Sequence, residues 1–130
     1  MDTKKFPLEA YGAAISREEL VQAALDEITQ NYREASLSNV ARAYGVSLAY
    51  VSECVRAQTG RTYKELLQKH RMETAARLLR RSDLNIQQII AQVGYENTSY
   101  FYRLFHERYG LSPREYRLVR NGAAPRRPTA

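Results

Sequence analysis

A pattern of two short helices joined by a tight turn occurs twice in this chain and constrains its fold more than any other feature. In one copy, Asn85 is suited to cap a helix that Gly94 ends. Asn97 then begins a second helix in which Phe101 and Phe105 share one side, together with either Leu104 or Arg108. The apolar residues of the first helix recur at helical spacing: Ile86, Ile89, Ile90 and Val93.

The other copy lies 49 residues earlier. Its first cap, apolar positions and glycine stop are Ser36, Leu37, Val40, Ala41 and Gly45. Beyond the turn the offset becomes 50, and the equivalents of Asn97, Phe101, Phe105 and Gly110 are Ser47, Val51, Val55 and Gly60. Both copies then continue into a capping box, Thr62 with Glu65 and Ser112 with Glu115. The chain therefore contains an internal duplication of a two-helix unit.

The outer face of each second helix carries candidate binding residues. In the second copy, at about residues 97–109, they are Asn97, Thr98, Ser99, Tyr102 and Arg103. In the first copy, at about residues 47–58, they are Ala49, Tyr50, Ser52, Glu53 and Arg56. A helix that presents small polar groups and an arginine fits the major groove of B-DNA. We therefore predict two helix-turn-helix units that bind double-stranded DNA.

The two copies are not expected to contribute equally to sequence recognition. Arg103 can bond bidentately to guanine, a contact typically worth about 1–3 kcal/mol of discrimination. The alternative is that it pairs with Glu96, Glu107 or a phosphate. The equivalent residue in the first copy is Glu53, whose carboxylate can accept from cytosine but is repelled by phosphates. We predict that the second unit dominates specificity.

Positive charge is concentrated in the duplicated part. The chain has a formal net charge of +6, but residues 1–36 carry −3, residues 37–83 carry +5 and residues 84–130 carry +4. A basic region attracts the phosphate backbone by releasing condensed counterions. A solvated basic face would have the same composition, so charge supports DNA binding only together with the duplicated motif.

The pattern predicts an all-α chain of about seven helices. We assign residues 1–15 to a flexible arm or linker, 16–61 to the first unit, 62–82 to a connecting helix, 83–119 to the second unit and 120–130 to a disordered tail. The helix after Ser16 is acidic and should pack behind the first unit. The connecting helix should span about 30 Å, close to the ~34 Å between equivalent major-groove faces of B-DNA. The last helix should begin at Pro113 and pack through Tyr116 and Val119.

Other functional classes find little support in the residues. A single cysteine, Cys54, excludes an internal disulfide, and we expect its side chain to be half-packed. Neither His70 nor His106 has a second ligand at metal-binding spacing, so no metal or other cofactor is expected. The residues suggest no catalytic constellation, and we expect a non-enzyme that is soluble and intracellular. A helical protein-interaction scaffold remains the alternative.

The second half closely resembles the AraC/XylS family of bacterial transcription regulators. The resemblance rests on Ala75, Leu78 and Leu79, followed by I-x-x-I-x-x-x-x-G-Y-x-x-x-S-Y-F-x-R-x-F-x-x-x-x-G-x-S-P-x-x-Y-R from Ile86 to Arg117. It implies two helix-turn-helix units joined by a long helix, each placing its second helix in one of two successive major grooves. It also implies cytoplasmic, nucleoid-associated gene activation through contact with RNA polymerase.

Members of this family usually carry an effector-binding domain in the same chain. The residues before the first motif are too few for a ligand-binding sandwich. We therefore expect either a stand-alone member or the DNA-binding fragment of a longer regulator. The family commonly has an arginine at the position of Glu53, so the first unit departs from the family pattern exactly where base reading is expected.

Overall fold

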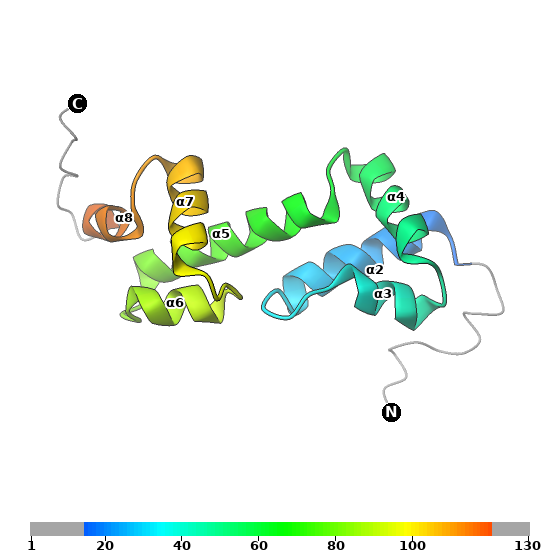
Figure 1. Ribbon diagram of the computed structural model, residues 1–130, viewed down its shortest axis with the longest axis horizontal. Coiled ribbons are helices and arrows are strands. Elements are labelled where there is room, and N and C mark those ends of the chain that lie inside the picture. Colours follow the sequence, from blue (N-terminus) through cyan, green and yellow to red (C-terminus); the bar gives the residue numbers. More distant parts are fainter. Residues whose placement is uncertain (1–14, 121–130) are drawn as a thin grey trace. The chain divides into compact units, whose positions relative to one another are not determined.

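The computed structural model describes residues 15–120, and every regular element in that range is a helix. The helices are α2 (Arg17–Gln30), α3 (Leu37–Tyr44), α4 (Leu48–Thr59), α5 (Tyr63–Arg81), α6 (Ile86–Gln92), α7 (Thr98–Tyr109) and α8 (Pro113–Arg120). The prediction of an all-α chain with about seven helices is thereby confirmed for the described part (Figure 1). The predicted arm, residues 1–14, and tail, residues 121–130, lie outside the described residues.

Hydrogen bonds from the predicted caps fix where the helices begin. Ser36, Ser47, Asn85 and Asn97 each accept from a backbone N–H in the first turn of the helix that follows. The N-terminus of α5 is held by a full capping box, in which Thr62 N–H donates to Glu65 Oε1 and Glu65 N–H donates to Thr62 Oγ1, both at 3.0 Å. Local sequence therefore sets where these helices start.

The duplicated glycines end α4 and α7 in the same conformation. Gly60 has φ 78° and Gly110 has φ 74°, in the left-handed region that glycine adopts without steric cost. The N–H of each donates to a carbonyl four residues earlier, Arg56 and His106 respectively. The sequence duplication is thus matched by a duplicated helix termination.

The chain divides into two compact units, and the boundary falls between Gln68 and Lys69, within α5. In the first unit, α2, α3 and α4 pack against one another, with the first turns of α5 completing the core. The buried residues are Leu20, Val21, Ala24, Ile28, Val40, Ala41, Val51, Cys54, Val55 and Tyr63. Cys54 is fully buried rather than half-packed as predicted, because it lies between Val51 and Val55 on the inward side of α4.

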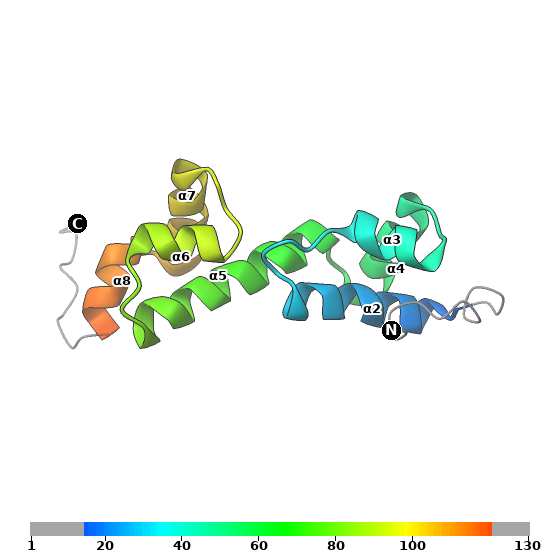
Figure 2. The same cartoon turned by 90° about the horizontal axis from the view of Figure 1, so that it is seen from below.

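In the second unit, Figures 1 and 2 show α6 and α7 beside the later turns of α5, and α8 packs against α7. Its buried apolar residues are Met72, Ala75, Ala76, Leu79, Ile89, Ile90, Val93, Tyr95, Phe101 and Phe105. Phe105 lies at the centre of an aromatic group, with ring centroids 5.8 Å from Phe101, 4.7 Å from Tyr109 and 5.4 Å from Tyr116. Rings at these separations add directional attraction to the area that they bury.

Arg117 joins α8 to the end of α5. Its guanidinium donates to the carbonyls of Leu84 at 2.6 Å, Leu79 at 3.0 Å and Ser82 at 3.1 Å, and to that of Leu78 at the 3.5 Å limit. The last carbonyls of a helix have no partner within the helix, and a cation at that end also interacts favourably with the helix dipole. One side chain therefore satisfies the end of α5 and the loop that leads to α6.

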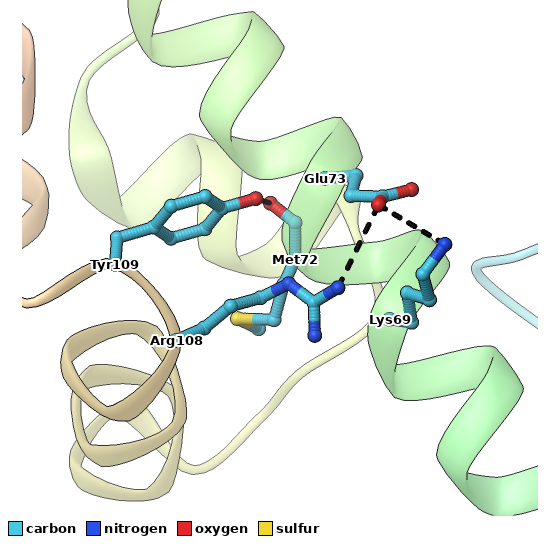
Figure 3. A network of polar contacts seen from close by, with 5 residues as sticks. All are labelled: Lys69, Met72, Glu73, Arg108 and Tyr109. Atoms are coloured by element: carbon cyan, nitrogen blue, oxygen red, sulfur yellow. Dashed lines mark hydrogen bonds and ion pairs between the residues drawn. The ribbon is translucent and has the colours of Figure 1, made fainter.

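Figure 3 shows a second link, between α5 and the end of α7. Glu73 Oε2 lies 3.3 Å from Lys69 Nζ and 3.6 Å from Arg108 Nη2, and the Tyr109 hydroxyl donates to the Met72 carbonyl at 3.4 Å. Arg108 therefore faces α5 through an ion pair. Leu104, which is half-buried, is the better third member of the apolar side of α7.

A second packing prediction, like that for Cys54, is wrong. Val119 is 43% exposed, as is its neighbour Leu118, whereas Tyr116 packs on Phe105 and Tyr109 as expected. Val119 lies about 60° around α8 from Tyr116, on the flank away from Arg117 and in the last turn of the helix, so the packing that holds Tyr116 does not cover it. Among residues 15–120, no helix has the length and apolarity that crossing a membrane requires.

Candidate nucleic-acid interface

The helix α7 separates its predicted binding residues from its core residues. Phe101 and Phe105 are fully buried. On the other side, Ser99, Tyr102 and Arg103 are exposed, and Tyr102 keeps 39% of its surface accessible despite its size. Thr98, the first residue of α7, is half-buried, and the exposed Asn97 caps the helix by accepting from Tyr100 N–H at 2.9 Å. Asn97 therefore shapes the start of the helix as well as standing beside its outer face.

Among the described residues, the Arg103 guanidinium contacts an aromatic ring and forms no ion pair with a carboxylate on α7 or in the turn before it. Its Cζ lies 5.1 Å from the ring centroid of Tyr100, one turn earlier on α7. Tyr100 in turn meets Tyr95 edge-on at 6.0 Å, and the guanidinium of Arg71 lies 5.2 Å over the Tyr95 ring. A guanidinium stacked on a ring keeps its N–H edge open to a further acceptor. Arg103 is thus positioned without losing its hydrogen-bonding capacity.

Burial also shifts the titration of the Tyr95 phenol. Desolvation raises the pKa of Tyr95 above its ordinary value of 10.0, and the positive charge of Arg71 opposes that shift only in part. Tyr95 follows Gly94 in the turn between α6 and α7, with only 9% of its surface accessible. The turn therefore provides a fixed aromatic support for Tyr100 and so for Arg103.

The helix α4 presents the predicted residues of the first copy in the same way. Val51, Cys54 and Val55 are fully buried, while all five predicted residues on the opposite side are exposed: Ala49, Tyr50, Ser52, Glu53 and Arg56. Tyr50 is 40% exposed, almost as much as Tyr102. Because Glu53 is exposed, its carboxylate stands on this outer face and not in the core.

Each unit thus contains a helix whose inner face is apolar and buried and whose outer face is polar and exposed. A tight turn and a shorter helix precede it in each unit. That arrangement is the helix-turn-helix geometry. Residues 40–118 match a helix-turn-helix domain family of the AraC/XylS type, so the match covers more than half of the chain. The chain belongs to the AraC/XylS family.

Individual AraC/XylS relatives agree with this assignment. The chain is 37% identical over 92 residues to the transcriptional activator NphR of a Rhodococcus species, and 31% identical over 111 residues to the uncharacterised regulator YijO of Escherichia coli. The alignments cover 69% and 85% of this chain, but only 27% and 39% of those relatives. The chain therefore spans roughly a third of the length of the curated relatives that it matches.

A solved AraC/XylS-type structure is similar over most of its length. The C-terminal domain of AraT, a response regulator from Geobacillus stearothermophilus, is 34% identical, with a TM-score of 0.71. The alignment covers 77% of this chain and 84% of that domain. The two-unit helical fold described above is therefore shared with an AraC/XylS relative of known structure.

Two residues near the outer faces were not anticipated from the sequence. Neither Tyr100 nor Arg17 is among the binding residues predicted from the sequence. The Arg17 guanidinium lies 5.6 Å over the ring of Tyr50. A usable signal did exist, because Tyr100 is the counterpart of Tyr50 at the 50-residue offset.

Within residues 15–120, no group of three or more His, Cys, Asp or Glu side chains is arranged to hold a metal ion.

Proposed function

We propose that this chain is the sequence-specific, double-stranded DNA-binding part of a transcription activator, and that α4 and α7 enter successive major grooves. The observation that carries the proposal is the exposure of the predicted reading residues on both helices. Nine of the ten are exposed and Thr98 is half-buried, while the opposite faces are closed by buried apolar side chains. The positive charge of the duplicated region supplies the non-specific attraction that such binding requires.

Residue roles follow from the chemistry of the two faces. Arg103 donates to a guanine, Ser99 and Thr98 contact bases or phosphates, and Tyr102 lies against the wall of the groove. Among the first-unit residues, Glu53 repels phosphates and accepts at most from a cytosine. The second helix-turn-helix, residues 83–119, therefore sets most of the specificity, and the first helix-turn-helix, residues 16–61, adds affinity and a weaker half-site.

The remaining roles are proposed from family membership. NphR is described as a transcriptional activator, and its length beyond the aligned part leaves room for further domains. We assign RNA polymerase as the protein partner, an effector-binding domain as the source of regulation, and the bacterial cytoplasm, at the nucleoid, as the place of action. Catalysis has no role in this scheme.

A salt titration separates DNA binding from the alternative, a helical scaffold for proteins. Binding of the chain to random duplex is measured by fluorescence anisotropy over a series of salt concentrations. With about six phosphate contacts, log K should fall against log salt with a slope of about −5, at about −0.9 per phosphate. A flat response would favour the scaffold.

Selection from a random duplex pool, followed by two alanine variants, then tests the assignment of residues. Arg103→Ala should weaken binding to the selected site by about 1–3 kcal/mol, roughly five- to 150-fold, and relax preference at one base pair. Glu53→Ala should have a smaller effect on the selected site and strengthen binding to random duplex. The control is Arg114→Ala, which removes an exposed arginine from α8. A larger loss of specific affinity from Glu53→Ala than from Arg103→Ala would overturn the ranking.

A further inference from the structure

The two reading helices share an aromatic feature at the same register. The third residue after each N-cap is a tyrosine, Tyr50 after Ser47 and Tyr100 after Asn97. An arginine guanidinium lies over each ring, at 5.6 Å for Tyr50 and 5.1 Å for Tyr100. In α7 the arginine comes from the same helix, as Arg103. In α4 the equivalent position is Glu53, and the arginine comes instead from Arg17 at the start of α2.

The first turn of α2 is held in place, so Arg17 has a defined base. Ser16 and Glu19 form a capping box around it, with Glu19 N–H donating to Ser16 Oγ at 3.0 Å and Ser16 N–H donating to Glu19 Oε1 at 3.2 Å. Leu20 and Val21, immediately after, are buried in the core that α2 and α4 share. In Figure 1 the first turn of α2 lies beside the start of α4. Arg17 itself is exposed.

We infer that Arg17 binds a DNA backbone phosphate beside the groove that α4 enters, with the Tyr50 ring holding its guanidinium in place. This inference rests on the proposed function and deepens it. A guanidinium that lies over a ring makes no hydrogen bond to it, so its N–H donors stay available to phosphate oxygens. The contact is to phosphate rather than to a base because Arg17 does not stand on the helix that enters the groove.

In α4 the position equivalent to Arg103 is the anionic Glu53. Arg17 would supply the first unit with a cation near that position. The contact adds affinity and fixes the register of α4, but carries no sequence information. It also places a DNA contact in residues 1–36, which are acidic overall at −3. The acidic segment is therefore not uniformly turned away from the duplex.

Arg17→Ala tests the contact, with Arg61→Ala as the matched control. Both variants remove one exposed arginine from the first unit, but Arg61 follows Gly60 at the opposite end of α4 from Tyr50. Loss of one phosphate contact should reduce the magnitude of the salt slope by about 0.9 and weaken binding about eightfold at ~0.1 M salt. The loss should be equal on the selected site and on random duplex, while Arg61→Ala leaves the slope unchanged.

Tyr50→Leu tests the role of the ring. Tyrosine carries no charge at neutral pH, so its own contacts to DNA do not enter the salt slope. A reduced slope in Tyr50→Leu, with no further reduction in the Arg17→Ala/Tyr50→Leu double variant, would show that the ring acts through Arg17. Far-UV circular dichroism checks that each variant keeps the helix content of the wild type.

Four outcomes overturn the inference. An unchanged salt slope for Arg17→Ala, in a chain that still binds DNA, would remove this contact but spare the proposed function. Equal effects of Arg17→Ala and Arg61→Ala would indicate net charge rather than a site. A loss confined to the selected sequence would show base reading instead of phosphate binding. A wild-type chain with no salt-dependent duplex binding would overturn the proposed function and this inference together.

Discussion

Replacing Arg117 by alanine should destabilise the second unit strongly, although the side chain reaches no apolar core. Two of its hydrogen bonds are of ordinary length, at 3.0 and 3.1 Å, a third is short, at 2.6 Å, and all three go to backbone carbonyls. A hydrogen bond from a charged donor contributes about 1.5–3 kcal/mol. Because the site is only half-buried, water can replace part of this loss. We therefore expect Arg117→Ala to lower the free energy of unfolding by about 2–4 kcal/mol, below the simple sum.

Urea unfolding followed by circular dichroism at 222 nm measures this effect. With a slope near 2 kcal/mol per molar urea, the expected loss corresponds to a midpoint about 1–2 M lower. Amide hydrogen exchange should speed up most in α6 and α8, the helices on either side of the lost contacts. The control is Arg114→Ala, which removes the same group from an exposed position on the same helix and should stay within about 0.5 kcal/mol of wild type. If the two variants unfold at the same urea concentration, the reasoning about Arg117 is refuted.

Three other substitutions have expected outcomes of different size. Phe105→Ala should cost about 3–5 kcal/mol by urea unfolding, since it removes the central ring of the aromatic group, and a cost below about 1 kcal/mol would contradict that packing. Glu73→Gln should change stability by no more than about 0.5 kcal/mol, because its side chain is 46% exposed, and a double-mutant cycle with Arg108 should find little coupling. Burial, then the charge of Arg77, lowers the pKa of His70 below 6.5, so the unfolded chain binds the proton more readily. The contribution of neutral His70 to stability should therefore be fully present above pH 6.5 and be lost as the pH falls toward the folded-state pKa. His70→Gln should remove this contribution from the difference between the urea midpoints measured at about pH 7.5 and about pH 5.5.

Features set by near neighbours in the chain were predictable from the sequence. The caps at Ser36, Ser47, Asn85 and Asn97 and the box at Thr62 all use bonds between residues two or three apart, so the residue type at each position carries the information. The buried faces of α4 and α7 could be predicted equally well, because helical spacing assigns each residue to one side of its helix. The exposed positions of the predicted reading residues follow from the same rule.

Contacts between distant residues were not predictable in this way. Arg114 and Arg117 are the same residue type on one short helix, but only Arg117 meets the carbonyls of residues more than 30 positions away. Arg17 and Tyr50 are likewise 33 residues apart. An arginine carries no local signal of its partner, so its role depends on where tertiary packing places it. The buried state of Cys54 and the exposure of Val119 were missed because each depends on the precise rotation of its helix.

The helix α5 serves two cores, one from each end. Tyr63, Leu66 and Leu67 pack with the first unit, whereas Met72, Ala75 and Leu79 are buried residues of the second, and a single capping box at Thr62 begins the whole helix. A cut anywhere within α5 would either expose apolar residues that one of the two cores buries, or leave the remaining part of the helix without an N-terminal cap. A laboratory that wishes to express either unit alone must therefore include α5 in both fragments and mask its unused apolar turns with polar residues. For the same reason, recombination within this helix would exchange whole units between relatives only where the crossover preserves both sets of apolar positions.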